Sequence, residues 1–463
     1  MGNGTSDKKI AEQLAEFIVG QKYEDLPAET IEKAKEYIID CSGCIVGAGS
    51  EPQARALLEV MQAEGGNPLS SVFGNGFKTS VMNAAMLNGT MGHIFDYDDD
   101  HREGTMHPTV AVFPGVFALG EKLKVDGKHL LRSLILGLEV MIRVGESYLG
   151  KSYYQGFHPT GTCGIYGSAA GCAMILGLDA LQTTYALGIA GSFAAGTLEW
   201  RTEGSWQKPL QAGHPAMLGV LAASLAQKNF IGARTIFDGP DGVIRAFSHK
   251  DQFDYSRITE TLGKQWEMKD TSIKVHACCR FGAPVADCAL ELYRQGVRAE
   301  NVKEILAKVG DFTVRVLCTP PERKMRPKTH VDGQFSLPYT AAVAICKNRT
   351  GVDEFKVEAL DDPEVLALMD KIKWEIDPSA EAFYPKAYPA TLIATLNDGQ
   401  TFETHVDFPK GDPENPATFD EIVTKFDSLT HTVLDEDRRK NIVQAVKGLD
   451  EMDDISELAD LLR

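Results

Sequence analysis

The feature that most constrains the fold is a series of long helical segments built from small and apolar residues. Residues 166–176 and 180–193 are dense in Ala and Gly, and residues 127–145 form a longer apolar run with helical periodicity. Small residues let helices approach one another closely. A helix that is apolar over most of its surface must itself be buried. Residues 1–269 are therefore predicted to form an all-helical domain with several buried helices.

The pattern changes near residue 270, where alternating and β-branched stretches begin. These stretches predict strands at residues 272–275, 307–317, 374–377, 390–396 and 401–408. The sequence Asn397-Asp398-Gly399 predicts a hairpin turn between the last two. Further helices are predicted at residues 283–294, 339–347, 419–429, 435–448 and 455–462. We expect residues 270–407 to form a smaller α+β domain, and residues 408–463 to complete the helical domain of residues 1–269.

Charge and composition exclude several kinds of partner. The formal net charge of -18 argues against binding to nucleic acid or to anionic membrane surfaces. No stretch reaches the roughly 18 uninterrupted apolar residues of a membrane span. The first residues lack an apolar signal core, and the nine Cys form no disulfide framework, so we expect a cytoplasmic protein. The pair Cys41 and Cys44 lies in a helical run, where packing is favoured over metal or redox chemistry.

Residues 92–108 carry an unusual concentration of polar groups between two apolar helices. The segment holds four Asp, three His and one Glu in seventeen residues. Such a cluster is costly to bury without partners. An acid- and His-rich turn between buried helices is a good candidate for proton-transfer chemistry. The alternative is a divalent metal site, because carboxylates and imidazoles suit several metals.

Other segments add basic and aromatic candidates. His158 precedes Pro159 at a helix entrance, where an anion would also sit, although a His that caps a loop would look the same. Lys208 lies at the mouth of an apolar helix, where it either binds an anion or extends its ammonium group to solvent. Tyr339 begins another helix and either presents its hydroxyl to a site or fills the core.

The turn at residues 274–280 is rich in cations. It contains Lys274, His276 and Arg280, and the position of Arg280 near a helix start suits bidentate recognition of a carboxylate. The adjacent Cys278 and Cys279 are interpreted as packing residues, because no other paired Cys completes a metal site.

One reaction class would use all of these groups. Removal of a proton from a carbon beside a carboxylate creates an enediolate-like dianion. His, Asp and Tyr can move the protons, and Lys and Arg can hold the carboxylates.

Taken in order, these segments resemble the MmgE/PrpD family, which includes 2-methylcitrate dehydratase, cis-aconitate decarboxylase and iminodisuccinate epimerase. The resemblance runs nearly end to end. The matching pieces are residues 88–93, 96–99, 107–108, 156–161, 188–192, 204–205 and 208–209, Lys274, and residues 278–280 and 335–339.

The resemblance implies a mostly α fold, with a large discontinuous helical domain and a smaller α+β lid domain. It also implies a homodimer and a cleft that takes di- or tricarboxylates without any cofactor or resident metal. By matched position, the predicted proton-transfer groups are His107 and His158, with Asp96 orienting an imidazole. The remaining predicted site residues are Tyr339 as a hydrogen-bond or proton donor, and Lys208, Lys274 and Arg280 as carboxylate ligands.

The chain departs from the family pattern at Asp100, where decarboxylases of the family carry Thr. The spacing to His107 is also one residue longer, and the stretch from Lys274 to Arg280 lacks the usual Phe-Pro-Ala run. Extra negative charge at Asp100 would disfavour a substrate carboxylate nearby. We therefore expect a 2-methylcitrate dehydratase-like lyase. The alternatives are a cis-aconitate decarboxylase-like enzyme, an iminodisuccinate epimerase-like isomerase and a non-catalytic carboxylate-binding protein.

Overall fold

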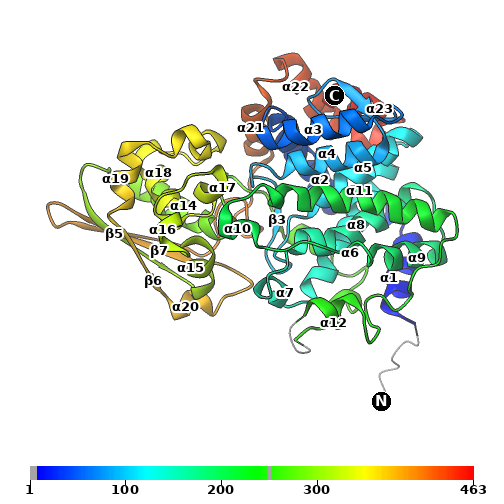
Figure 1. Cartoon of the computed structure of the whole chain (residues 1–463), viewed down its shortest axis with the longest axis horizontal. Coiled ribbons are helices and arrows are strands. Elements are labelled where there is room, and N and C mark those ends of the chain that lie inside the picture. Colours follow the sequence, from blue (N-terminus) through cyan, green and yellow to red (C-terminus); the bar gives the residue numbers. More distant parts are fainter. Residues whose placement is uncertain (1–7, 249–251) are drawn as a thin grey trace.

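The computed structural model of the chain describes residues 8–248 and 252–463. The start of the chain, on which the expected cytoplasmic location partly rests, includes residues 1–7, which lie outside the described residues. Within the described ranges, no helix combines the length and apolarity that crossing a bilayer requires. The fold is mostly α-helical with a smaller α+β region, as predicted (Figure 1).

The part of the chain before residue 270 is built from helices packed on one another. They are α1 (Ile10–Gly20), α2 (Ala28–Gly47), α3 (Pro52–Glu64), α4 (Val81–Gly92), α5 (Pro108–Leu123), α6 (Gly127–Glu146), α7 (Lys151–Tyr154), α8 (Pro159–Ile175), α9 (Ala180–Ala190), α10 (Trp200–Glu203), α11 (Gln207–Gln227), α12 (Val243–Phe247) and α13 (Ser256–Thr259). Helix α11 packs against α4, α5, α8 and α9, and α8 also packs against α6. Two short antiparallel ribbons join β1 (Ser70–Val72) to β2 (Phe77–Thr79), and β3 (Asp100–His101) to β4 (Thr271–Ser272).

Glycines allow the central helices to touch. A Cβ atom on Gly89 of α4 would lie 2.9 Å from the Cα of Gly213 on α11. Between α6 and α8, a Cβ on Gly137 would lie 2.8 Å from the carbonyl oxygen of Gly167. The density of small residues in the sequence therefore does correspond to close packing of helices.

The second part of the chain contains a four-stranded sheet with helices around it (Figure 1). The strand order is β6-β5-β7-β8, with β5 and β6 parallel and the other two pairings antiparallel. The strands are β5 (Val302–Val309), β6 (Ile372–Ile376), β7 (Ala390–Leu396) and β8 (Thr401–Val406). The helices are α14 (Ala283–Arg294), α15 (Asp311–Leu317), α16 (Pro321–Lys324), α17 (His330–Gln334), α18 (Leu337–Lys347), α19 (Pro363–Met369) and α20 (Pro378–Glu381). The predicted hairpin is confirmed, and Gly399 in its turn has a φ of 91°.

Two strand predictions are wrong in part: the strand predicted at residues 272–275 ends at Ser272, and the one predicted at residues 307–317 is wrong in its second half. Residues 307–317 were expected to form one strand, but β5 ends at Val309 and residues 311–317 form α15. Gly310 separates the two elements, and Asp311 supplies an acidic group in the first turn of the helix. Phe312 of α15 packs against the aromatic rings of Phe281 and Tyr384. Tertiary packing thus overrides the β-branched composition.

The last helices return to the first part of the chain. Helix α21 (Phe419–Thr430) packs along α2, α22 (Glu436–Lys447) also contacts α2, and α23 (Ser456–Leu462) contacts β1. Lys425 of α21 forms a buried ion pair with Asp40 of α2 at 2.5 Å. The division into residues 1–269 plus 408–463 and residues 270–407 stays a prediction, and one hydrophobic core cluster includes residues of both parts.

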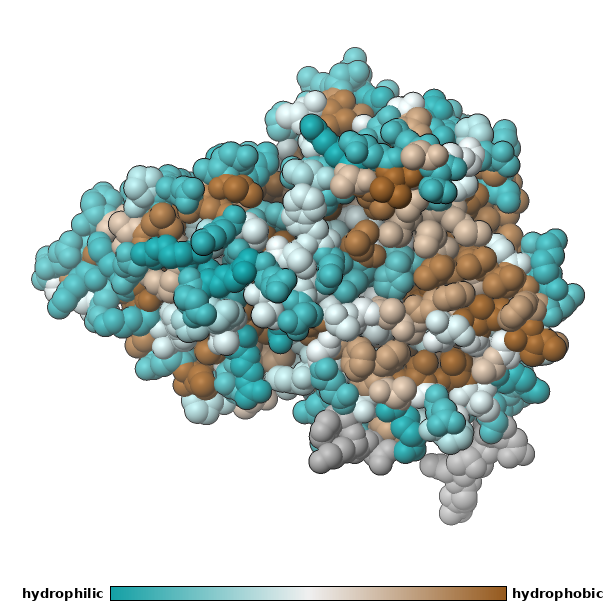
Figure 2. All heavy atoms as spheres, in the orientation of Figure 1, coloured by the Kyte–Doolittle hydropathy of each residue, from teal (hydrophilic) through white to brown (hydrophobic). Residues whose placement is uncertain are grey.

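Apolar side chains gather on one face of the helical part, over α9 and α11 (Figure 2). The exposed large hydrophobic residues on α9, on α11 and just after α11 are Leu181, Leu210, Phe230 and Ile231. Ile231 is 74% exposed, so this apolar surface is open to solvent in the single chain.

The close contact of α4 with α11 yields a stability prediction. In Gly213→Ala, the new methyl group would lie 2.5 Å from the carbonyl oxygen of Met86, so the helices must separate. We expect the free energy of unfolding, measured by urea denaturation, to fall by about 1–3 kcal/mol. Gly20→Ala is the matched control, because a Cβ atom there meets nothing within 4 Å. Equal stability of the two variants would contradict the role assigned to this contact.

Candidate active site

A pocket lies where the segment of residues 92–108 meets α8, α10, α11 and the turn after β4. Its lining residues are Asp96, Asp100, Thr105, Met106, His107, Tyr153, His158, Trp200, Lys208, Cys279, Arg280, Phe281, Phe335 and Tyr388. Five of the seven site residues predicted from the sequence are in this set. The other two are not in the lining. Lys274 contacts the lining residue Asp96, and the hydroxyl of Tyr339 is hydrogen-bonded to the backbone of Glu354.

The same local sequence feature, a His-Pro pair at a helix start, places His107 and His158 in the pocket lining. Each stands immediately before the proline that begins a helix, Pro108 of α5 and Pro159 of α8. A residue before proline is restricted to extended backbone, and both histidines adopt it. Neither imidazole caps its own helix, so both rings are available to the pocket.

Asp96 is held by two lysines from distant parts of the chain. Its Oδ1 lies 2.7 Å from Nζ of Lys274 and 3.1 Å from Nζ of Lys208. Burial alone would raise the pKa of Asp96, but the two ammonium groups outweigh burial and hold this pKa below its usual value. Asp96 has a φ of 49°, a left-handed conformation that Asp tolerates better than most residues. Asp96 is therefore an ionised anchor for two cations.

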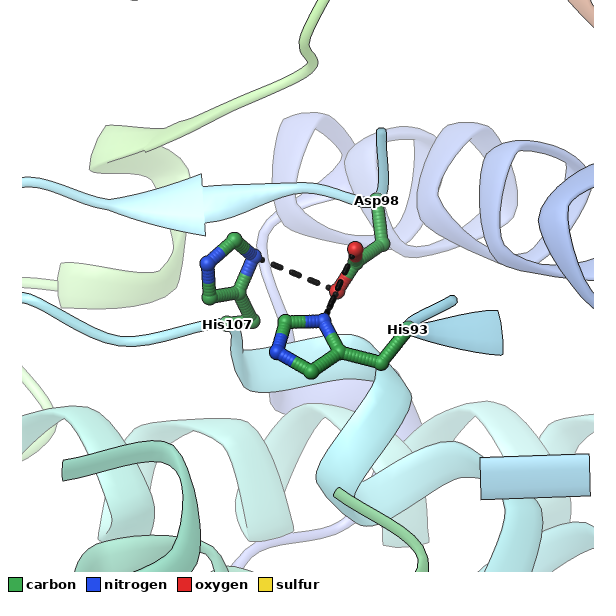
Figure 3. A group of neighbouring side chains, drawn as sticks. All are labelled: His93, Asp98 and His107. Atoms are coloured by element: carbon green, nitrogen blue, oxygen red, sulfur yellow. Dashed lines mark hydrogen bonds and ion pairs between the residues drawn. The ribbon is translucent and has the colours of Figure 1, made fainter. Parts of the chain in front are cut away.

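Asp98, rather than Asp96, lies between two imidazoles (Figure 3). Nδ1 of His93 donates to Asp98 at 2.8 Å, and Nδ1 of His107 lies 3.2 Å from the same oxygen, at an angle outside hydrogen-bond geometry. Burial would raise the pKa of Asp98, but the two histidines keep it well below the usual value. Asp96 is 3.6 Å from Nε2 of His107, so its predicted role in orienting an imidazole is better matched by Asp98.

His93 is a site residue to which the sequence analysis assigned no role. Burial, together with nearby Lys208, lowers the pKa of His93 to about 3, so the ring is neutral near pH 7. Because Nδ1 donates to Asp98, Nε2 accepts a hydrogen bond from Nζ of Lys208 at 2.9 Å. The signal available in the sequence was the position of His93 at the end of α4, inside a matched family segment.

His93, Asp98 and His107 could also offer three ligand atoms to a metal, all within 4.8 Å of one another. The donor types suit several divalent metals. Two features favour a hydrogen-bonded group instead. The carboxylate of Asp98 already accepts a hydrogen bond from His93, and the ammonium of Lys208 lies 2.9 Å from the far side of the His93 ring. A further positive ion in this position would be repelled by Lys208.

Arg280 and Asp100 also line the pocket. The guanidinium of Arg280 contacts both oxygens of Asp412, at 2.5 and 2.6 Å, and its Nε lies 3.3 Å from Oδ2 of Asp100. Oδ1 of Asp100 is buried and has no hydrogen-bond partner among the described residues. Burial raises the pKa of Asp100 despite the neighbouring Arg280 and Lys274. Asp100 therefore differs from Asp96, since burial favours its protonated form.

Tyr339 does not line the pocket. Its hydroxyl donates to the carbonyl oxygen of Glu354 at 2.6 Å and lies 3.2 Å from that of Ala359. This arrangement matches the alternative reading, a core aromatic residue with a satisfied polar tip.

An aromatic wall completes the pocket, and sequence spacing gave no indication of it. Trp200 of α10 packs edge-on against Phe335, with ring centroids 5.2 Å apart, and Phe281 packs against Tyr388 at 4.6 Å. These four residues come from separate segments of the chain, so no local pattern could join them. They shield the polar groups from water, which strengthens the electrostatic interactions between them.

Two further buried titratable groups, His101 and Glu146, lie close to each other outside the pocket lining. Nε2 of His101, in β3, is 3.6 Å from Oε1 of Glu146 at the end of α6. Burial lowers the pKa of His101 to about 3. Burial, with Glu267 and Glu103 nearby, raises the pKa of Glu146 to about 9, so Glu146 carries a proton at neutral pH.

Comparison with known proteins gives a match over most of the chain. The model of the MmgE/PrpD N-terminal domain matches residues 12–256, and that of the MmgE/PrpD C-terminal domain matches residues 276–451. The cis-aconitate decarboxylase-like protein oryM of Aspergillus oryzae is 29% identical over 491 residues, which cover 99% of this chain and 98% of that protein. The cis-aconitate decarboxylases of Mus musculus and Homo sapiens are each 26% identical, covering 98% of this chain and 94% and 95% of their own lengths.

The buried Glu146 yields a pH prediction. Its pKa is raised in the folded state, so its contribution to stability is complete below the unfolded pKa of about 4.5 and is lost as the pH rises toward about 9. Glu146→Gln mimics the protonated form and should remove this loss. Between pH 5 and 8, we expect the wild type to lose up to about 1.4 kcal/mol per pH unit relative to the variant in urea unfolding. Glu64→Gln, at the exposed end of α3, should keep the wild-type slope, and an unchanged slope in Glu146→Gln would refute the assignment.

Proposed function

This chain belongs to the MmgE/PrpD family, and from that premise we propose that it is a cofactor-independent lyase of di- or tricarboxylates. In this proposal, the first step removes a proton from a carbon beside a substrate carboxylate. The proposal rests mainly on one observation. The imidazoles of His107 and His158 line the same pocket as the buried ammonium group of Lys208, and aromatic rings surround them.

His107 is the proposed base. Its Nδ1 faces the ionised Asp98, and a carboxylate in this position favours the tautomer that leaves Nε2 as the acceptor of a proton. Its ring lies in the pocket, 6.5 Å between centroids from that of His158. Burial keeps the pKa of His158 well below its usual value, so His158 is a neutral hydrogen-bonding group rather than a cation.

Lys208 is the proposed ligand of the carboxylate beside the reacting carbon. Its ammonium has three protons, of which one is directed to Nε2 of His93 and one to Asp96. The third is available for a substrate oxygen. As the proton leaves the carbon, negative charge grows on that oxygen, and an ammonium group already oriented by the protein stabilises it.

The properties of Asp100 support loss of a hydroxyl group as water in the step that follows removal of the proton. A buried carboxyl with a raised pKa and an unpartnered oxygen in the pocket can donate a proton. As His107 takes the proton from carbon, the electron pair forms the alkene, and the carbon–oxygen bond on the adjacent carbon breaks. Asp100 gives its proton to the departing hydroxyl, which leaves as water. We therefore favour a 2-methylcitrate dehydratase-like hydro-lyase.

Decarboxylation is the second candidate, because the relatives named above are cis-aconitate decarboxylases or resemble them. In that reaction a carbon–carboxylate bond breaks, carbon dioxide leaves, and an imidazolium protonates the resulting carbanion. This route needs no acid beside a leaving hydroxyl, so it gives no function to Asp100.

On the same family resemblance we propose a homodimer. The exposed apolar residues on α9, on α11 and just after α11, including Leu210, Phe230 and Ile231, are a surface that a second copy would cover. The mass of the purified protein by light scattering tests this proposal.

The first test of the lyase proposal is turnover. Purified, chelator-treated protein is incubated with 2-methylcitrate, citrate or cis-aconitate, and alkene absorbance and carbon dioxide release are followed. We expect alkene formation, with kcat lowered about 10²–10⁴-fold in His107→Gln, since the base is lost. His405→Gln, on the exposed edge of the sheet, is the control and should be unaffected. Wild-type activity in both His107→Gln and His158→Gln would contradict the catalytic assignment. Deuterium uptake without alkene or carbon dioxide would point to epimerisation.

The second test separates dehydration from decarboxylation. Asp100→Asn keeps the shape of the side chain but cannot donate a proton. If the enzyme is a hydro-lyase, we expect kcat for the hydroxy acid to fall at least about 10²-fold. Glu103→Gln, three residues away, serves as the control for a local change of charge. Carbon dioxide release from cis-aconitate that is equal in the wild type and Asp100→Asn, without dehydration of any hydroxy acid, would establish the decarboxylase alternative.

A further inference from the structure

We propose that Lys324 is a further substrate-binding residue, which holds a second carboxylate remote from the reacting carbon and so selects polycarboxylates over acids with fewer carboxylates. The inference rests on the proposed function and deepens it, because it assigns a specificity determinant outside the pocket lining described above.

Lys324 is a buried cation that has no counter-ion among the described residues. It ends the short helix α16, and its side chain is only 1% exposed. Within the part of the chain that the structure describes, no carboxylate lies at ion-pair distance from its Nζ, and its Nζ makes no hydrogen bond. The nearest candidate, Asp332, is occupied by Arg323 at 2.5 Å and by the backbone N–H of Thr329. An unpaired buried ammonium is costly, and a ligand carboxylate would remove that cost.

The position of Lys324 connects it to the pocket. Its Nζ lies over the ring of Phe335, 5.9 Å from the centroid, and Nζ of Lys208 lies over the same ring at the same distance. Phe335 lines the pocket, so both ammonium groups lie near a ring of the pocket wall. Lys208 is bound to Asp96, whereas no carboxylate among the described residues forms an ion pair with Lys324. In our proposal, the second carboxylate of the substrate passes the edge of the Phe335 ring to reach Lys324.

Arg201 adds positive charge on the same side. Its guanidinium lies over the ring of Tyr153, which also lines the pocket, at 5.9 Å from the centroid. Arg201 and Lys324 repel one another, and this repulsion lowers the pKa of Lys324 further. Lys274 is paired with Asp96, and Arg280 is paired with Asp412. Apart from Lys208, which the proposed function assigns to the first carboxylate, the positive charge available to a ligand is at Lys324 and Arg201.

The environment of Lys324 makes the proposal sensitive to pH. Burial is the largest influence and lowers the pKa of Lys324 to about 8 in the free protein. The charged and titratable groups around it are Asp332, Cys279, Arg201, Cys318 and Arg323. Among them, burial raises the thiol pKa of both Cys279 and Cys318 to about 12, so neither thiol becomes an anion near pH 8. Affinity for a polycarboxylate should therefore decline as the pH rises above 8, when Lys324 loses its charge.

The experiment measures binding directly, with tricarballylate as a tricarboxylate probe and pentanoate as a monocarboxylate of similar chain length. Titration calorimetry at pH 7 is applied to the wild type, Lys324→Met and Lys324→Arg. We expect Lys324→Met to lose about tenfold or more in affinity for tricarballylate, since one charged contact is removed, with little change for pentanoate, which has no second carboxylate. Lys324→Arg should retain the preference and, unlike the wild type, keep it at pH 9. Lys373→Met, on the exposed face of the sheet, is the matched control.

The outcomes separate this inference from the proposed function. Removal of a buried unpaired charge should leave the unliganded protein as stable as before, which thermal unfolding of Lys324→Met verifies. Unchanged tricarballylate affinity in folded Lys324→Met, with normal turnover in the wild type, would overturn the role of Lys324 alone. The wild type could also turn over none of the acids while Lys324→Met still loses the preference for the tricarboxylate. That result would support the binding role of Lys324 and reject the lyase proposal. If Lys324→Met does not fold, equal pH profiles for the wild type and Lys324→Arg would overturn the inference.

Discussion

The buried contact of Asp96 with Lys208 and Lys274 is the interaction on which the rest of the site depends. It joins the loop after α4, the start of α11 and the turn after β4 at one carboxylate. The backbone oxygen of Lys274 in turn accepts a hydrogen bond from Lys425 at 2.8 Å, and Lys425 is paired with Asp40 on α2. Buried ion pairs thus connect helices from both ends of the chain with the residues around the pocket. Loss of one partner would leave an uncompensated buried charge, which costs about 3–5 kcal/mol.

The same contact determines which groups remain available for chemistry. Oδ1 of Asp96 contacts both lysines and the carboxyl is held in the ionised form, so Asp96 is an anchor and a poor proton carrier, although its buried Oδ2 has no hydrogen-bond partner among the described residues. Asp98 is committed to His93 and faces His107, which leaves His107 to act as a base. Asp100, only two residues further on, has one unpartnered oxygen and a raised pKa. Asp96 and Asp98 are therefore held in the ionised form, whereas burial favours the protonated form of Asp100, because each carboxyl meets a different set of charges.

Much of the fold and part of the site could be predicted from local sequence. The two His-Pro pairs predicted where α5 and α8 begin, because proline restricts the residue before it, and both histidines do line the pocket. The Asn-Asp-Gly turn predicted the β7–β8 hairpin for a similarly local reason. Residues 311–317 were predicted to be a strand and are a helix, because their conformation depends on the rings that surround Phe312. Tyr339 was expected to donate to a substrate, but its hydroxyl meets backbone carbonyls that lie 15 and 20 residues further along the chain.

By itself, the sequence determined the mostly helical architecture, the hairpin, the residue types of the pocket and the family resemblance, since these follow from periodicity, turn residues and short motifs. Only the tertiary structure decided the role each group can take. It placed Asp98 between two imidazoles, assigned His93 to Lys208, and left Asp100 and Lys324 without full partners. The physical reason is that protonation and pairing depend on burial and on charges brought together from distant segments, and no local sequence pattern encodes those distances.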